Sequence, residues 1–268
     1  MRRGEVARGS RTALVTGASS GIGKAIAERL AAYGYNLVIV SRDEEQLRSV
    51  AEQIEATYSV QVRHRSIDLG TQEAAYELYE WCKSEKTEID VLVNDAGMFI
   101  YNDTLKCDLN RIEHIMNLHM VTPTLLCRLF GDDMASRRRG YILNIASYSV
   151  WMNYPGLSLY SASKNYLRSF SKPFAGEMRS RGVKVTAVSP AGVTTDLYGL
   201  PDKYKKLGHN IGVLASPEKI ARVSLRAMFR GRRHIVPGIM NRAAIPLLVI
   251  LPDFVIRLAR RLTMCLQK

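Results

Sequence analysis

The sequence is poor in cysteine and lacks an apolar leader, and each shortage excludes a class of protein. Its four cysteines, Cys82, Cys107, Cys127 and Cys265, are scattered and include no Cys-x-x-Cys pair. This argues against a disulfide framework or a cysteine-based zinc site, and it favours reduced thiols in a cytoplasmic setting. The first ten residues are basic without an apolar core, so no secretory signal is expected. No metal site is predicted.

Acidic residues are also in deficit, most of all near the C-terminus. The chain has 38 Lys and Arg against 25 Asp and Glu, a net charge of +13. From Arg226 to Lys268 there are nine basic residues and one acid, Asp253, so +8 of that charge lies in 43 residues. These are interleaved with Leu, Ile and Val, and the only aromatics are Phe229 and Phe254. The pattern therefore favours an anionic membrane surface over nucleic acid.

What the chain does contain is a regular alternation of short apolar runs and amphipathic stretches across its 268 residues. Strands are predicted at 11–16, 35–41, 60–66, 90–94, 140–146, 183–189 and 234–236. Helices are predicted at 22–34, 43–57, 71–86, 108–136, 158–181 and 216–230. This βα alternation predicts a single doubly wound α/β domain with a parallel sheet over residues 11–238. An N-terminal arm at 1–10 precedes it, and an apolar, basic extension at 239–268 follows it.

A hydroxyl, a phenol and an ammonium are grouped in the middle of the chain. Tyr160 and Lys164 share one face of a predicted helix, and Ser147 follows the strand at 140–146. An ammonium beside a phenol favours the phenolate, which permits acid/base chemistry near neutral pH, and the serine can hold a substrate oxygen. The spacing alone is weak, because Tyr79 and Lys83 repeat it on what reads as a solvated helix face.

A glycine-rich turn, Gly17-Ala-Ser-Ser-Gly21-Ile-Gly23, joins the first strand to the first helix. Such a turn lets backbone amides and a helix N-terminus approach a pyrophosphate, which indicates a dinucleotide site. At the end of the second strand, where an acid would bind the ribose of NAD, the chain has Ser41-Arg42. An arginine there can bind a 2′-phosphate, so NADP(H) is the predicted cofactor. Asp68 is a candidate for the adenine amine or, alternatively, a helix cap.

These motifs, with Asn94-Asp-Ala96-Gly97 and Pro190-Ala-Gly-Val193-Thr-Thr195, resemble the short-chain dehydrogenase/reductase family over about residues 10–236. The resemblance implies that Tyr160 is the general acid, with Lys164, Ser147 and Asn117 completing the catalytic set. It implies a cofactor site formed by Gly17, Ser19, Ser20, Gly21, Ile22, Gly23, Ser41, Arg42, Asp68, Asn94, Ala96, Gly97, Tyr160, Lys164, Pro190, Val193 and Thr195.

Two residues depart from the family pattern. Asp95 stands where the family usually has a second asparagine, and Ala191 stands where it usually has glycine. Ser149 is an alternative to Ser147, but its spacing from Tyr160 does not fit the family. His114 and His119 are interpreted as structural. Met98, Trp151 and Tyr154 are predicted to line a largely apolar substrate pocket, with residues 193–212 as a lid.

The expected function is an NADPH-dependent oxidoreductase acting on a lipophilic ketone or secondary alcohol, such as a 3-oxoacyl, keto-sphingoid or sterol-like compound. The alternatives are a reductase of small soluble ketones or sugars and a catalytically silent NADP(H)-binding scaffold. The extension at 240–268 is too short in apolar residues to span a bilayer, and it could contact an anionic membrane, a partner subunit or the substrate pocket. The resemblance also implies a homodimer or homotetramer, formed through the helices at 108–136 and 158–181. No binding of nucleic acid is expected.

Overall fold

The computed structural model describes residues 11–195, 214–252 and 254–256, together with Leu197, Lys203, Lys206 and Arg260. The predicted arm at 1–10 and most of the predicted lid at 193–212 lie outside these residues. So do Asp253 and most of the basic stretch that follows Phe254.

Seven strands form one parallel sheet in the order β3-β2-β1-β4-β5-β6-β7. The strands are β1 (Thr12–Thr16), β2 (Asn36–Ser41), β3 (Val62–Ser66), β4 (Ile89–Asn94), β5 (Gly140–Ile145), β6 (Val183–Val188) and β7 (His234–Ile235). The predicted doubly wound parallel fold is confirmed. The strand order reverses between β1 and β4, and in such sheets ligands bind outside the carboxyl ends of the strands at that point.

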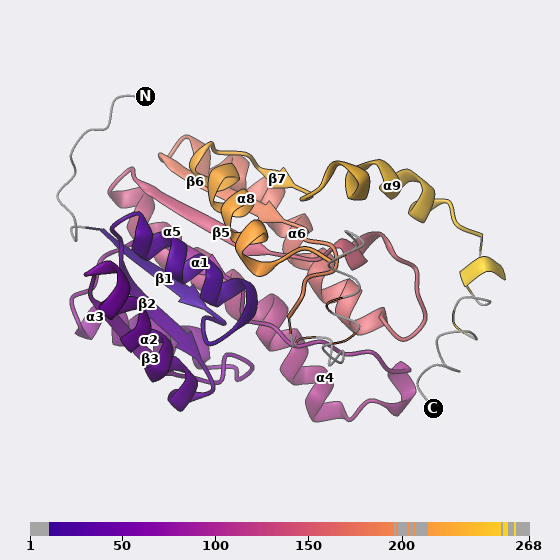
Figure 1. The fold of residues 1–268 in the computed structure, drawn as a ribbon, viewed down its shortest axis with the longest axis horizontal. Coiled ribbons are helices and arrows are strands. Elements are labelled where there is room, and N and C mark those ends of the chain that lie inside the picture. Colours follow the sequence, from indigo (N-terminus) through magenta and orange to yellow (C-terminus); the bar gives the residue numbers. More distant parts are fainter. Residues whose placement is uncertain are drawn as a thin grey trace.

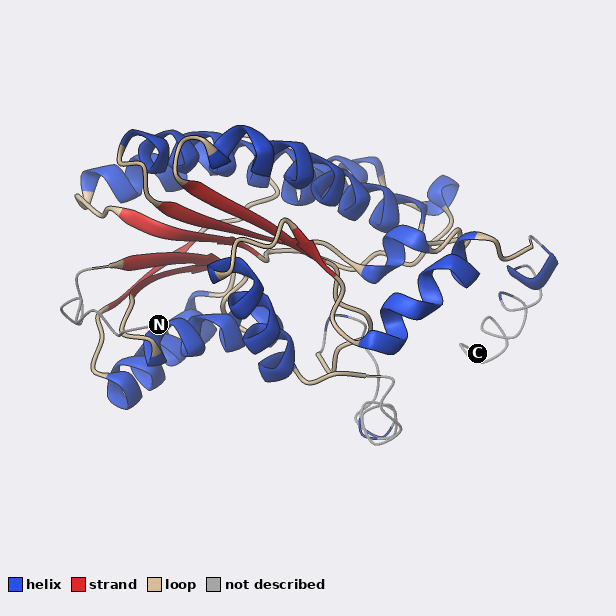
Figure 2. Cartoon of the chain, turned by 90° about the horizontal axis from the view of Figure 1, so that it is seen from above, coloured by secondary structure: helices blue, strands red, loops and turns tan. Residues whose placement is uncertain are grey.

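In the described part of the chain, three helices cover each face of the sheet, and Figure 2 shows the helices on both sides of the strands. Helices α1 (Gly21–Ala32), α2 (Glu44–Tyr58) and α8 (Pro217–Phe229) pack on one face, and α3 (Ala74–Ser84), α5 (Thr122–Ser136) and α6 (Ser158–Arg179) pack on the other. Successive strand residues point to opposite faces, so Ala13 and Val15 join the first core layer and Leu14 joins the second. Burial on both faces explains why the central strands are almost wholly apolar.

The helix predicted at 108–136 is present but contains a change of helical type. It comprises α4 (Leu109–Met116), a π-helical turn η2 (Asn117–Val121) and α5. The Asp108 carboxylate caps its N-terminus by accepting a hydrogen bond from the Arg111 amide. The π turn was not predicted, because a widened turn leaves no mark on apolar periodicity over so short a stretch. Two 3₁₀ turns, η1 (Thr104–Lys106) and η3 (Tyr148–Trp151), follow β4 and β5 along the chain.

The C-terminal extension begins with helix α9 (Ile239–Val249), which projects beyond the sheet (Figure 1). Among the described residues, the Tyr148 hydroxyl donates to the Asn241 carbonyl at 2.7 Å, and the Asn241 and Arg242 side chains donate to the Pro237 and Val236 carbonyls at 3.0 and 3.4 Å. No residue of α9 is buried. Among the described residues, no helix is both long and apolar enough to cross a bilayer.

The turn from β1 into α1 depends on a residue without a side chain. Gly17 has φ of +71°, a conformation that side-chain-bearing residues rarely adopt. A Cβ at Gly17 would lie 2.9 Å from both the nitrogen and the Cα of Ala96, at the end of β4. Glycine therefore allows the turn to lie directly against the neighbouring strand end.

We expect Gly17→Ala to lower the free energy of unfolding by about 1–3 kcal/mol, because it combines a strained φ with a backbone clash. The matched control is Gly176→Ala on α6, where an added Cβ meets nothing within 4 Å. That substitution should stabilise the helix by about 0.5–1 kcal/mol. Urea unfolding followed by circular dichroism measures both, and equal effects of the two variants would contradict the strain at Gly17.

Candidate functional site

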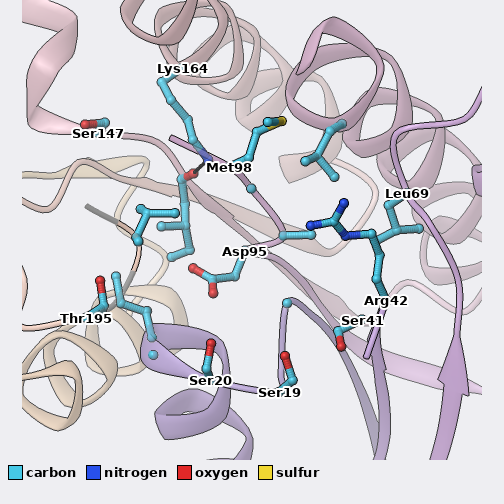
Figure 3. Close-up of a pocket in the computed structure, with 18 of the residues that line it drawn as sticks. Ser19, Ser20, Ser41, Arg42, Leu69, Asp95, Met98, Ser147, Lys164 and Thr195 are labelled. Carbon is cyan, nitrogen blue, oxygen red and sulfur yellow. Dashed lines mark hydrogen bonds between the residues drawn. The ribbon is translucent and has the colours of Figure 1, made fainter. Parts of the chain in front are cut away.

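A cavity of about 310 Å³ opens at the carboxyl ends of the central strands, where the strand order reverses (Figure 3). Most of the predicted site residues line it. They are Gly17, Ser19, Ser20, Gly21, Ile22, Ser41, Arg42, Asp68, Ala96, Gly97, Met98, Ser147, Tyr160, Lys164, Pro190, Val193 and Thr195. Residues from five separate motifs thus meet in one cleft.

The glycine-rich turn forms one wall of this cleft and is held by a threonine. The Thr16 hydroxyl oxygen accepts hydrogen bonds from the backbone amides of Asp95 and Ala96, each 3.1 Å long, and donates to the Val93 carbonyl. These bonds fix the end of β1 to the end of β4. The turn therefore presents the N-terminus of α1 to the cleft, where a helix dipole favours an anion.

One end of the cleft carries a positive and a negative side chain, Arg42 and Asp68. Arg42 is exposed and lines the cleft beside Asp68. Burial acts to raise the pKa of Asp68, but hydrogen bonds from the Gly70 amide and from His114, whose Nε2 lies 2.9 Å away, outweigh it and lower the pKa. Asp68 is thus an ionised acceptor that is already engaged by His114, as the structural interpretation of that histidine expects.

The opposite end carries the phenol, the ammonium and the serine. Tyr160 and Lys164 lie one turn apart on α6 and are 3 % and 5 % exposed. The Lys164 ammonium donates to the Ile145 carbonyl at 3.0 Å. Burial lowers the pKa of Lys164 to about 8, and the nearby Asp95 carboxylate opposes that shift. A lysine whose pKa lies near neutral pH can take part in proton transfer.

Ser147 is oriented by Ser149, the residue that the sequence offered as an alternative to it. Its Oγ accepts hydrogen bonds from the amide and the hydroxyl of Ser149, at 3.1 and 3.0 Å. Because both bonds are donated to Ser147, its own hydroxyl hydrogen is left to donate toward the cleft. Ser149 is therefore a supporting residue of Ser147 in this geometry.

His119 closes the wall behind Tyr160 and Lys164. It is 1 % exposed, its Nε2 accepts from the Met98 amide at 3.1 Å, and its Nδ1 lies 2.9 Å from the Ser163 hydroxyl. Burial, reinforced by the Lys164 charge, holds the pKa of His119 well below its usual range. A neutral ring that accepts at Nε2 must carry its proton on Nδ1, so it donates to Ser163, which donates to the Tyr160 carbonyl.

Five predicted residues do not line the cleft: Gly23, Asn94, Asn117, Trp151 and Tyr154. Asn94 is buried within the sheet, where it donates to Asn144 at 2.8 Å. Trp151 packs against Arg168 and His234, and Tyr154 lines a separate cavity beside α6. Asn117 begins the π turn and stays half-buried. Their predicted roles remain predictions.

Other residues line the cleft but were missed from the sequence: Asp43, Ile67, Leu69, Asp95, Leu118, Ile145 and Ala146. Leu197 also lines it and falls within the predicted lid at 193–212. Four of the missed residues, Ile67, Asp95, Ile145 and Ala146, end or directly follow a strand, and that position was the signal that could have found them. Asp95 is the clearest case, because side chains alternate along the end of β4 and Asn94 turns inward. In the part of the chain that the structure describes, no three His, Cys, Asp or Glu residues gather where a metal ion could be held.

Comparison with known proteins gives a consistent assignment. The family model described as short chain dehydrogenase matches residues 11–203. The chain is 35 % identical over 192 residues to an uncharacterised oxidoreductase of Staphylococcus saprophyticus, covering 72 % of this chain and 82 % of that protein. It is 35 % identical over 191 residues to very-long-chain 3-oxoacyl-CoA reductase-B of Danio rerio, and 34 % identical over 189 residues to 17-beta-hydroxysteroid dehydrogenase type 3 of Mus musculus. Each alignment covers 69 % of this chain, but only 60 % and 61 % of those two proteins.

Solved structures agree. A short-chain dehydrogenase from Sphingobium yanoikuyae in complex with NADPH superposes with a TM-score of 0.77 at 25 % identity, covering 90 % of this chain and 96 % of that one. A 7beta-hydroxysteroid dehydrogenase structure superposes with a TM-score of 0.81 at 23 % identity, covering 89 % and 91 %, and supports the fold. The chain belongs to the short-chain dehydrogenase family of oxidoreductases.

Proposed function

We propose that this protein is an NADPH-dependent carbonyl reductase that interconverts a lipophilic ketone and its secondary alcohol. The observation that carries the proposal is the cleft itself. It joins the glycine-rich turn and Arg42 at one end to Ser147, Tyr160 and Lys164 at the other. A binding scaffold without catalysis would have no need of a complete acid/base set.

The residues present fit a dinucleotide phosphate. The absence of a Cβ at Gly17 lets the turn lie against the Ala96 backbone, and the turn then presents the α1 N-terminus to the cleft, where a pyrophosphate would bind. Arg42 lies at the end of β2, where its guanidinium would bind a 2′-phosphate. When bound, the cofactor supplies the hydride. The similar Sphingobium yanoikuyae structure is itself a complex with NADPH.

The protein residues supply the proton and hold the substrate. Ser147 would donate its free hydroxyl hydrogen to the carbonyl oxygen, because Ser149 occupies its acceptor side. Tyr160 would transfer its phenolic proton to the same oxygen as negative charge develops there. The Lys164 ammonium would stabilise the phenolate that remains, from a position fixed by the Ile145 carbonyl.

A lipophilic substrate is favoured by the wall that faces the reacting groups. Met98 and Leu118 line the cleft beside Tyr160, and Ile100, Ile115 and Tyr160 form a small apolar cluster behind it. The two named relatives act, by their names, on a 3-oxoacyl-CoA and a hydroxysteroid, both lipophilic ketones or alcohols. A reductase of small polar ketones is the second candidate, and substrate chain length separates the two.

Tyr160→Phe removes only the phenolic hydroxyl, so we expect kcat to fall by about a hundredfold or more while NADPH affinity changes little. Absorbance at 340 nm follows NADPH oxidation against ketones of increasing alkyl length, with Tyr79→Phe as the matched control on α3. The unmodified protein should gain kcat/KM as the chain lengthens. Full activity in Tyr160→Phe, or a preference for short polar ketones, would contradict the acid assignment or the substrate class respectively.

Arg42→Ala should raise the Kd for NADPH by about ten- to a hundredfold and leave the Kd for NADH nearly unchanged. The reason is that only NADPH carries the 2′-phosphate that the guanidinium would pair with. Arg48→Ala is the control, since Arg48 is exposed on the neighbouring turns of α2 and does not line the cleft. Cofactor fluorescence titration gives both constants. Equal losses for the two cofactors would show that Arg42 does not select NADPH.

The proposal extends to a membrane surface, because α9 exposes an apolar face. Ile239, Met240, Leu247 and the capping residue Ile250 are 86 %, 77 %, 64 % and 73 % exposed. At about 100° per residue they fall within an arc of about 100°, whereas Ile245 and Leu248 lie outside this arc and are half-buried; Val249, also outside it, is 53 % exposed. A symmetric contact with a second copy would oppose two segments of +8 charge, so an anionic lipid surface is the better complement.

The double variant Leu247→Ser/Ile250→Ser should bind vesicles of phosphatidylcholine with 30 mol % phosphatidylserine about tenfold more weakly than the unmodified protein. Tyr76→Ser on α3, a partly exposed residue far from α9 in the sequence, serves as the control. Flotation measures the bound fraction. If neither protein binds vesicles and the double variant instead dissociates a dimer in sedimentation, the face is a subunit contact.

A further inference from the structure

Asp95 introduces a negative charge into the cleft at the place where the family usually has an uncharged asparagine. Its carboxylate points into the cleft over the glycine-rich turn and lies on the same side as Ser20 (Figure 3). Its close neighbour is Gly23, in the first turn of α1, where an added Cβ would lie 2.8 Å from the Asp95 Oδ2. The Gly23 amide stabilises the ionised carboxylate. Asp95 thus places its charge at the N-terminus of the helix that the phosphates of a dinucleotide would use.

We propose that Asp95 makes dinucleotide affinity depend on its own ionisation, with weaker binding when the carboxylate is charged. This inference rests on the proposed cofactor site. An anionic side chain and a pyrophosphate at one helix N-terminus repel each other, and they also compete for the same partial positive charge. Protonation of Asp95 removes the repulsion and leaves a group equivalent in charge to the asparagine.

The groups around Asp95 support a titration near neutral pH. Burial raises the pKa of Asp95 to about 7, against the opposing effects of Lys164 and the Gly23 amide. Lys164 on α6 is the charged group that acts on it. His119 on η2 is held neutral, and Tyr160 lies beside Lys164. At the far end of the cleft, Arg42 acts on Asp68, and Asp43 caps α2.

The summed charge of Asp95 and Lys164 changes with pH. With Asp95 protonated and Lys164 charged, the pair contributes +1 to the cleft at low pH. As pH rises through the pKa of Asp95 the sum becomes 0, and above the pKa of Lys164, about 8, it becomes −1. A cofactor that carries several negative charges should therefore bind progressively more weakly as pH rises.

The test compares the unmodified protein with Asp95→Asn, which restores the uncharged family residue. NADPH fluorescence titrations at constant ionic strength between pH 5.5 and 7.5 give Kd for both proteins. Their ratio cancels the titration of the cofactor's own 2′-phosphate, because both proteins bind the same ligand. The ratio should be close to 1 at pH 5.5 and about two- to fourfold in favour of the variant at pH 7.5, because a carboxyl with a pKa of about 7 is still roughly one-quarter protonated there.

Two further variants test whether the position of the charge and the size of the side chain matter. Asp43→Asn also removes a carboxylate that lines the cleft, and asparagine keeps the cap of α2. Because Asp43 lies at the Arg42 end of the cleft, away from the α1 N-terminus, the ratio of NADPH Kd values between the unmodified protein and this variant should stay constant over this pH range. Asp95→Ser is neutral and smaller, and it should reproduce the ratio of Asp95→Asn if charge is the cause. Circular dichroism confirms that each variant is folded.

A second readout separates a charge effect from a packing effect. Asp95 raises the pKa of Lys164, so Asp95→Asn should move the alkaline limb of the kcat profile to lower pH. A pH-independent Kd ratio with an unmoved alkaline limb would overturn the inference while leaving the proposed function intact. If the unmodified protein bound NADPH at no pH, the proposed function and this inference would fall together.

Discussion

The geometry of the cleft depends on the three hydrogen bonds of one threonine hydroxyl. Thr16 ends β1, and its Oγ1 is bonded to the backbone at the end of β4 through the amides of Asp95 and Ala96 and the carbonyl of Val93. Two strand ends that are distant in sequence are thereby held in contact. The glycine-rich turn can then lie against Ala96, and Asp95 is placed over α1. Without this link, the two walls of the cleft would be joined only by the sheet below them.

A second polar group supports the same edge from inside the core. Asn94 donates to the Asn144 oxygen at 2.8 Å, and Asn144 donates to the Ser171 hydroxyl, also at 2.8 Å. These fully or nearly buried side chains connect β4, β5 and α6 in a layer that is otherwise apolar. Buried polar groups of this kind are costly unless they are paired, so each partner fixes the orientation of the next. The row sets the position of α6, which carries Tyr160 and Lys164.

Much of the fold followed from the sequence, because apolar periodicity and turn residues are local signals. All seven strands and the long helices lie where they were expected, to within a few residues. The cleft was assembled from motifs whose order implied a common sheet edge. The pair with the same spacing, Tyr79 and Lys83, lies outside the cleft: both side chains contact Asp133 of α5, and the Tyr79 ring also packs against Phe130.

The parts that could not be predicted depend on orientation. Asn94 and Asp95 are adjacent, and only the twist of the strand end decides which one faces the cleft. Trp151 follows Ser147 closely in sequence, yet the 3₁₀ turn η3 directs it toward Arg168 and His234. The role of His119 depends on partners that lie 21 and 44 residues away, and no local pattern marks them.

The π turn at Asn117–Val121 has a consequence for how the long helix serves two neighbours. A π turn holds one residue more than an α turn, so it shifts the angular phase of α4 relative to α5 by roughly 100°. Because of that offset, α5 can keep its buried face against the sheet while Ile115 of α4 turns toward the apolar cluster around Tyr160. One continuous helix thus has two independently oriented faces. Side chains on α4 can be exchanged to repack the apolar cluster around Tyr160 without rotating α5 on the sheet.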